Sequence, residues 1–244
     1  MTELFKNRLS GTQLKYIAML CMLADHLGAG ILSPLIRQGY TDLIPWYDTM
    51  RSVGRLAFPL YCLLAAEGVK RTRHKLRYIL GLWFFAAISE IPFDMTAMGV
   101  LYDQENQNVY FTLAAAVTVY FISRKIHGMW KFIPYIIAAV FAHVIKSDYG
   151  AFGILMLCLY FSGVNTIQYM AGSAEIIKGL CALFKNSWLQ VPSIPTTVGA
   201  YMLLLGSYNG KRGISRMKNK YVFYAFYPIH LLLIGVVRMY LLHG

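Results

Sequence analysis

Asp25 and His26 stand side by side within an apolar run that extends from Leu14 to Leu32. An ionised side chain at the centre of a bilayer costs roughly 2.5–3.5 kcal/mol on insertion scales, so a chain that keeps one there must supply partners for it. The pair therefore indicates a polar site to which this apolar segment contributes.

Other polar residues stand near the ends of further apolar runs, at a depth that matches this pair. They are Arg51, Arg55, Ser89, Glu90, Asp94, Asn108, Thr112, His143 and Asp148. Ionisable residues inside a membrane are functional candidates by default, and together these favour a site. For single pairs a structural interpretation stays open: Asp25 with Arg55, and Glu90 or Asp94 with Arg51, would hold helices together. Asp148 would then only cap the helix that follows it.

Glu67 and His230 are expected near the opposite, inner face. Glu67 precedes Lys70 and Arg71 by one helical turn, a spacing that favours an ion pair. His230 follows Pro228, which removes a backbone hydrogen bond from its helix. This histidine either satisfies the freed carbonyl or meets a cytoplasmic donor molecule.

The composition indicates which elements must position these residues. Of the 244 residues, 57% are hydrophobic and 14% are charged, against about 45–50% and about 25% in soluble domains. The net charge of +12 comes mainly from Lys and Arg between apolar runs, as membrane topology requires, so no nucleic-acid partner is expected. The four cysteines lie inside apolar runs without metal-site spacing, and no metal is expected.

We predict one all-α domain over residues 1–244, a polytopic bundle of about nine transmembrane helices. The basic segment 70–77, together with Lys6 and Arg8, predicts a cytoplasmic N-terminus, and Lys211–Lys220 should again lie inside. The segments Gln38–Arg51 and Met95–Gln107 are expected to be loops. The expected helices are about Leu14–Ser33, Val53–Val69, Tyr78–Phe93, Asn108–Ser123, Phe132–Ile145, Ala151–Tyr169, Ser173–Phe184, Trp188–Ser207 and Tyr221–Leu242.

Several segments, in order along the chain, resemble the TraX family. They are LKYIAMLCMLADHLGA (14–29), MRSVGRLAFPLYCLLAAEGVKRTR (50–73), ISEIPFD (88–94), QNVYFTL (107–113), DYGAFGIL (148–155) and NKYVFYAFYPIHLLLI (219–234). The resemblance implies a multipass bacterial plasma-membrane acyltransferase. It would move an acetyl group from cytoplasmic acetyl-CoA to an amine acceptor, such as the N-terminus of a pilin or another peptide, at or across the membrane.

On this interpretation, His26 is the general base or a transient acyl carrier. Adjacent residues of a helix point about 100° apart, so Glu90 or Asp94 orients His26 more easily than Asp25 does. Arg55 and Asn108 would stabilise an oxyanion or hold the acceptor. The residues predicted to bind the acceptor are Arg51, Asn108, Thr112, Asp148 and Tyr149, and those predicted to bind acetyl-CoA are Arg71, Arg73, Tyr227 and His230.

Two other classes of function stay open. In a proton-coupled transporter, the residues Asp25, His26, Arg55 and Glu90 would line a translocation path; transporters commonly carry internal repeats, and none is visible here. In a non-catalytic assembly subunit, the intramembrane charges would pair off completely. Binding of acetyl-CoA separates the enzyme from both.

Overall fold

The computed structural model describes residues 8–184, 193–213 and 221–243, and within them the chain is all-α, as predicted. Nine continuous helical segments occur in these ranges, without a β-strand. The chain forms two compact units, each described here by itself: a first unit of Met1–Leu64 and Asn165–Phe223, and a second unit of Ala65–Val164 and Tyr224–Gly244. The single domain over residues 1–244 stays a prediction.

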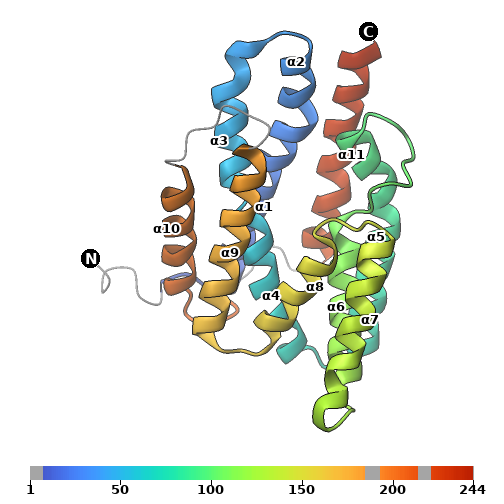
Figure 1. Ribbon diagram of the computed structural model, residues 1–244, viewed down its shortest axis with the longest axis vertical. Helices are drawn as coiled ribbons and strands as arrows, with labels where there is room; N and C mark the ends of the chain where they lie inside the picture. The colour runs from blue at the N-terminus through green and yellow to red at the C-terminus, as the bar shows by residue number, and fades with distance from the viewer. Residues whose placement is uncertain (1–7, 185–192, 214–220, 244) are drawn as a thin grey trace. The chain divides into compact units, whose positions relative to one another are not determined.

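The first unit begins with helix α1 (Gly11–Leu27; Figure 1). Two sets of hydrogen bonds satisfy backbone N–H groups at the start of this helix. Ser10 and Gln13 form a capping box, in which each side chain satisfies the backbone N–H of the other. The backbone N–H groups of Gly11 and Thr12 donate to the carbonyls of Lys211 and Arg212, at 2.8 and 2.9 Å. Part of the predicted inner basic segment therefore caps α1; residues 214–220 lie outside the described residues.

The first helix was predicted to end near Ser33. In the structure it continues to Arg37. A π-helical segment (Gly28–Leu32) joins α1 to α2 (Ser33–Arg37). Pro34 has no N–H to donate, and the N–H of Ser33 reaches back five residues to the carbonyl of Gly28. The extra residue in this turn accommodates the proline without breaking the helix.

The predicted loop Gln38–Arg51 is mostly helical. A 3₁₀ turn (Thr41–Leu43) leads into α3 (Ile44–Gly54), and Pro45 lies in the first turn, where a missing N–H costs nothing. Helix α4 (Ala57–Arg71) continues the segment and passes from the first unit into the second. Helices α9 (Asn165–Phe184) and α10 (Ser193–Gly206) complete the first unit: α3 packs against α1, and α10 packs against α9 and α3.

The second unit contains α5 (Lys75–Ala97), α6 (Val109–Ser123), α7 (Ile133–Val144), α8 (Gly150–Phe161) and α11 (Tyr221–His243). A 3₁₀ turn (Gly128–Phe132) precedes α7. Neighbouring helices from α5 to α8 run in opposite directions (Figure 1). The end of α5 and the beginnings of α6 and α8 therefore lie at one end of this unit.

The boundary between the sixth and seventh predicted helices was wrong by several residues. Helix α8 stops at Phe161 and α9 begins at Asn165, so the predicted Ala151–Tyr169 is shorter and the predicted Ser173–Phe184 is longer. Gly163 has a φ of 75°, a left-handed conformation that ends a helix and favours glycine. The predicted start of the eighth helix at Trp188 lies outside the described residues.

The register of α11 against α5 is set by specific contacts. Tyr224 stacks on Phe85, with ring centroids 5.4 Å apart, and Thr96 Oγ1 donates to the carbonyl of Leu231 at 2.6 Å. Gly235 lies against Met95, where an added Cβ would come within 2.5 Å of the methionine Cβ. The beginning of α11 therefore packs near the middle of α5, and its later turns pack against the end of α5.

Four helical segments of the described ranges are long and apolar enough to cross a membrane: Gly11–Arg37, Thr41–Arg71, Lys75–Ala97 and Val222–Leu241. Shorter apolar helices are Val109–Ser123, Gly128–Val144, Gly150–Phe161 and Ile194–Gly206. Side chains that face lipid explain the many large apolar residues exposed on α5, α7 and α11. These features indicate a membrane protein; the orientation of its N-terminus stays a prediction.

Candidate functional site

Asp25 binds two arginines within the first unit. Its Oδ2 accepts from Arg51 Nη1 at 2.7 Å, and its Oδ1 accepts from Arg55 Nη2 at 3.0 Å. The three side chains keep only 15–17% of their surface exposed. The predicted ion pair of Asp25 with Arg55 is confirmed, and Arg51 shares the same carboxylate.

Glycines leave room for this ion-pair cluster of Asp25, Arg51 and Arg55. A Cβ added at Gly54 would overlap the carboxylate and Cβ of Asp25, and one at Gly28 would meet Arg51 Cδ at 3.3 Å. On α9, Gly179 lies against Arg55 in the same way. His26, half-buried, follows Asp25 on α1. Glu90 and Asp94 belong to the second unit, so their predicted orientation of His26 stays a prediction.

Glu90, at the end of α5, is held by Asn108, the N-cap of α6. Asn108 Nδ2 donates to Glu90 Oε2 and to the carbonyl of Ala86, the latter at 2.8 Å, while its Oδ1 accepts from the N–H of Tyr110 at 3.0 Å. An asparagine side chain has two donor hydrogens, and these contacts use both. Asn108 therefore positions Glu90, and a hydrogen bond donated to a substrate would break one of these contacts.

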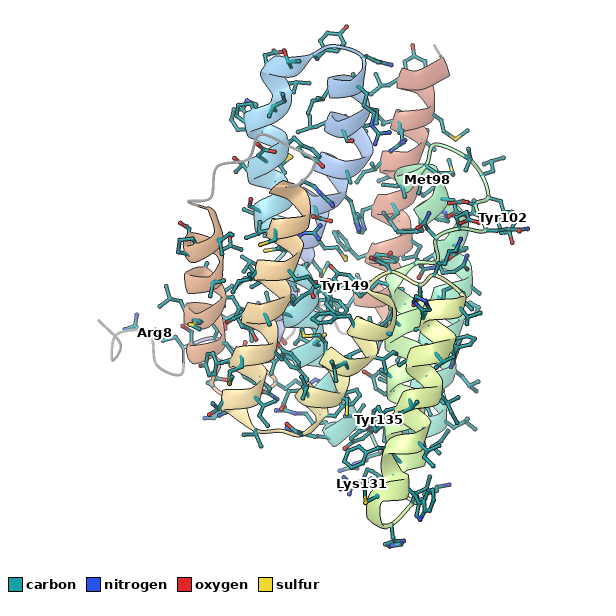
Figure 2. All side chains as sticks on the ribbon, in the orientation of Figure 1. Arg8, Met98, Tyr102, Lys131, Tyr135 and Tyr149 are labelled. Carbon is teal, nitrogen blue, oxygen red and sulfur yellow. The ribbon has the colours of Figure 1, made fainter. Side chains whose placement is uncertain are left out.

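Asp94 lies one turn after Glu90 on α5 and is fully buried. Its Oδ2 accepts from the backbone N–H of Asp103 at 2.9 Å. This contact holds the loop of residues 98–108 against the end of α5. Figure 2 shows Met98 and Tyr102 at this end of the second unit, far from Lys131 at the other end.

The start of α8 is linked to α6 by contacts of Thr112, Asp148 and Tyr149. Thr112 Oγ1 donates to the carbonyl of Asp148 at 2.5 Å, and Thr112 is fully buried. Asp148 is exposed, and its Oδ1 accepts from the N–H of Tyr149 at 3.1 Å, so it serves the backbone that precedes α8. Tyr149 has a φ of 65° and directly precedes α8. All three lie, as predicted, at the end of the unit where Asn108 begins α6 and binds Glu90. Thr112, however, is buried and bonded to the backbone, so its role is structural.

His230 and Tyr227 lie at the same end, which corrects their expected place near the inner face. Depth was predicted from each residue's distance along its own helix. Because α11 is displaced along α5, His230 lies closer to the end of α5 than that distance suggests. Tyr227 meets Tyr110 with ring centroids 5.0 Å apart, and the charges of Glu90 and Asp148 act on its phenol. Leu231, the neighbour of His230, is bonded to Thr96. Both residues are buried, Tyr227 against Tyr110 at the start of α6 and His230 against Tyr227.

The His230 ring is held in a defined orientation. Its Nδ1 lies 2.6 Å from the carbonyl oxygen of Phe226, and because a carbonyl can only accept, Nδ1 carries the hydrogen. The ring stacks on Phe226 at 4.6 Å and meets Tyr227 edge-on at 5.8 Å. A histidine fixed through Nδ1 has its lone pair on Nε2, as an acid–base catalyst needs.

Arg71 and Arg73 are not brought together with His230 and Tyr227. Both arginines are exposed at the turn before α5, and the length of α5 separates them from its acidic end. The predicted pair of Glu67 with Lys70 and Arg71 is confirmed, with Glu67 Oε2 2.6 Å from Arg71 Nη2. Binding of acetyl-CoA by Arg71 and Arg73 stays a prediction.

Two buried charged residues were not among the candidates chosen from the sequence. Arg238, two turns after His230, donates to the carbonyl of Thr96 at 2.8 Å, and Glu175 is buried on α9, one turn before Gly179. A charged residue inside an apolar segment was the available signal for both. Among the described residues, groups of three or more His, Cys, Asp or Glu side chains that could hold a metal do not occur.

Comparison with known proteins agrees with the sequence resemblance. A model of the TraX protein family matches residues 10–238. A protein of Dichelobacter nodosus, described as a probable fimbrial assembly protein FimC of serogroup H1, is 29% identical over 95% of this chain and 97% of its own length. No solved structure matches this chain. Since the family match spans nearly all of the helices described above, this chain belongs to the TraX family.

Proposed function

We propose that this protein is an acetyltransferase of the bacterial cell membrane that moves the acetyl group of acetyl-CoA onto an amine. The TraX family supports the acetyl transfer, through the resemblance set out above. The related protein described as a fimbrial assembly protein supports an acceptor on a pilin or another surface peptide. The protein would cross the membrane several times, with the basic segment 70–77 inside.

The observation that carries this proposal is the place of His230. Its ring is fixed through Nδ1, and it lies at the end of the second unit that carries Glu90, Asp94, Asn108 and Tyr227; we call these four residues and His230 the α5 cluster. A positioned histidine raises the rate of a proton transfer by roughly 10²–10⁴-fold. We therefore move the role of general base, first given to His26, to His230.

The reaction balances with this residue as the base. The acceptor ammonium first releases one proton to water, and the free amine attacks the thioester carbon. A C–N bond forms and the C–S bond breaks. His230 Nε2 takes the second proton from the nitrogen and passes it to the sulfur, so that CoA leaves as the thiol. Arg71 and Arg73, which the length of α5 separates from His230, would attract acetyl-CoA to their own end of α5 by charge and do not hold it at the base.

The test uses the full-length protein in detergent with acetyl-CoA and a short peptide that has a free N-terminus. Mass spectrometry measures the acetylated peptide, because the free cysteines Cys21, Cys62, Cys158 and Cys181 would disturb an assay for released thiol. Exchange of His230 for Asn should lower the rate at least about 100-fold. His127→Asn is the matched control, since His127 is exposed in the same unit, before the 3₁₀ turn that precedes α7, and it should leave the rate unchanged.

Three results would contradict the proposal. If a peptide with a blocked N-terminus and lysine-free sequence is acetylated equally well, the acceptor is not an amine. If wild-type protein transfers no acetyl group to any amine tested, the transferase proposal fails, and transport or assembly takes its place. If His26→Asn abolishes transfer while His230→Asn does not, the base lies in the first unit.

A further inference from the structure

Carboxylates gather around the end of α5 in the second unit. Glu90 and Asp94 are four residues apart and therefore lie on the same face of the helix. Asp103, on the loop of residues 98–108, donates its backbone N–H to Asp94 Oδ2 at 2.9 Å. Asp94 is fully buried, and Glu90 and Asp103 are half-buried.

In each of the two acids of α5, one carboxylate oxygen accepts a hydrogen bond and the other has no hydrogen-bond partner among the described residues. Asp94 Oδ2 accepts from Asp103 and Glu90 Oε2 accepts from Asn108. Asp94 Oδ1 and Glu90 Oε1 are buried, and neither has a hydrogen-bond partner in the part of the chain that the structure describes. A buried acceptor without a partner costs roughly 1–3 kcal/mol, and more when it is charged.

Cations of the second unit do not neutralise this pair within the described ranges. Lys146 pairs with Glu105, and Lys70 and Arg71 pair with Glu67. Arg238 donates to the carbonyl of Thr96. An ion pair to Glu90 or Asp94 is absent from the described residues. Two carboxylates on one helix face therefore each keep a buried oxygen that lacks a partner among the described residues, and a cation could supply it.

We propose that Glu90 Oε1 and Asp94 Oδ1 bind the ammonium group of a small molecule or peptide that also carries an apolar group. Both oxygens can only accept when ionised, and an ammonium group has three donors and no acceptor, so the two are complementary. Hydrogen bonds between charged partners are about twice as strong as neutral ones. A metal ion fits less well, since a group of three ligating side chains is absent from the described residues.

The apolar group is inferred from the loop next to this site. Met98, Leu101 and Tyr102 expose 45%, 60% and 64% of their surface. The bond from the Asp103 N–H to Asp94 holds the loop beside the carboxylate. Figure 2 shows Met98 and Tyr102 together at this end of the unit. An amine with an apolar body would contact both surfaces at once.

This inference rests on the proposed function only in naming the bound amine as the acetyl acceptor. In that role, Glu90 and Asp94 would hold the ammonium group of the acceptor in the unit that contains His230. The binding of an amine by this site does not require acetyl-CoA. It can therefore be tested without the transfer reaction.

The experiment measures the thermal stability of the full-length protein in detergent, without acetyl-CoA, at constant ionic strength. The probes are 2-phenylethylamine, its neutral counterpart 2-phenylethanol, methylamine and potassium chloride. We expect 2-phenylethylamine to raise the melting temperature most, methylamine less, and the alcohol and potassium not at all. Glu90→Gln and Asp94→Asn should each weaken the binding of 2-phenylethylamine at least tenfold.

Glu105→Gln is the matched control, because Glu105 is an exposed acid on the same loop. It should bind 2-phenylethylamine as the wild type does, whereas Leu101→Ser should reduce the response toward that of methylamine. An equal shift with the alcohol or with potassium would overturn the inference, and so would equal binding by Glu90→Gln and Glu105→Gln. Where a variant fails to fold, the comparison of probes on the wild type decides. Amine binding without acetyl transfer would reject the proposed function and retain this site.

Discussion

At the residue scale, the two predicted acidic positions have different surroundings. Asp25 has both carboxylate oxygens bonded to guanidinium groups, so it serves the contact of α1 with α3. Glu90 and Asp94 each keep one oxygen without a partner in the described residues. Asp25 is therefore a stabilising residue of the first unit, and the two acids of α5 are better candidates for contact with a substrate.

Asp25→Asn should lower the free energy of unfolding by about 3–5 kcal/mol, because it leaves two largely buried guanidinium groups without their shared anion. Denaturant unfolding in detergent, followed by the loss of helical circular dichroism, measures this change. Asp42→Asn is the control in the same unit: Asp42 is exposed, and its exchange should change stability by no more than about 0.5 kcal/mol. Equal stability of the two variants would mean that the ion-pair cluster contributes nothing to folding.

At the element scale, helices approach closely where glycine leaves room. Gly54, near the end of α3, lies so close to Asp25 of α1 that an added Cβ would overlap its Cβ as well as its carboxylate. A side chain can rotate away, but the Cβ of Asp25 moves only with the α1 backbone. Gly199 on α10 has open space around it.

Gly54→Ala should therefore destabilise the protein by about 1–3 kcal/mol through overpacking. Gly199→Ala should stabilise it by about 0.5–1 kcal/mol, because alanine loses less backbone entropy in a helix. Melting temperatures of both variants, measured under the same conditions, give the comparison. A more stable Gly54→Ala variant would show that α1 and α3 are farther apart than described.

At the scale of the whole molecule, the predicted orientation places the turn before α5 inside and the loop of residues 98–108 outside, since Lys and Arg favour the cytoplasmic side. Arg73→Cys and Gln104→Cys place a thiol at exposed positions of each. A membrane-impermeant maleimide should label Gln104→Cys in intact spheroplasts, and Arg73→Cys only after lysis. The wild-type chain, with its own cysteines, gives the background. The opposite labelling pattern would reverse the orientation and move the α5 cluster to the inner side.

The sequence by itself determined that the chain is all-α and roughly where its helices lie, because long apolar runs and turn residues act locally. It also indicated that Asp25 needs a cation, since an unpaired buried charge is costly wherever it lies. Contacts between residues far apart in the sequence decided how the helices lie against one another and which polar residues come together. Tyr224 on Phe85 and Leu231 on Thr96 fix α11 along α5 and bring His230 to Asp94's end of that helix.

The role of Asn108 likewise depends on the tertiary structure, since both of its side-chain donor hydrogens are bonded, to Ala86 and to Glu90. A sequence lists donors and acceptors but not which of them are already bonded. The π-helical turn at Gly28–Leu32 shows the same limit for helix ends: Pro34 predicts a break, and one extra residue in the turn avoids it. Local patterns thus specify the helices, and their packing specifies which polar atoms remain for a substrate.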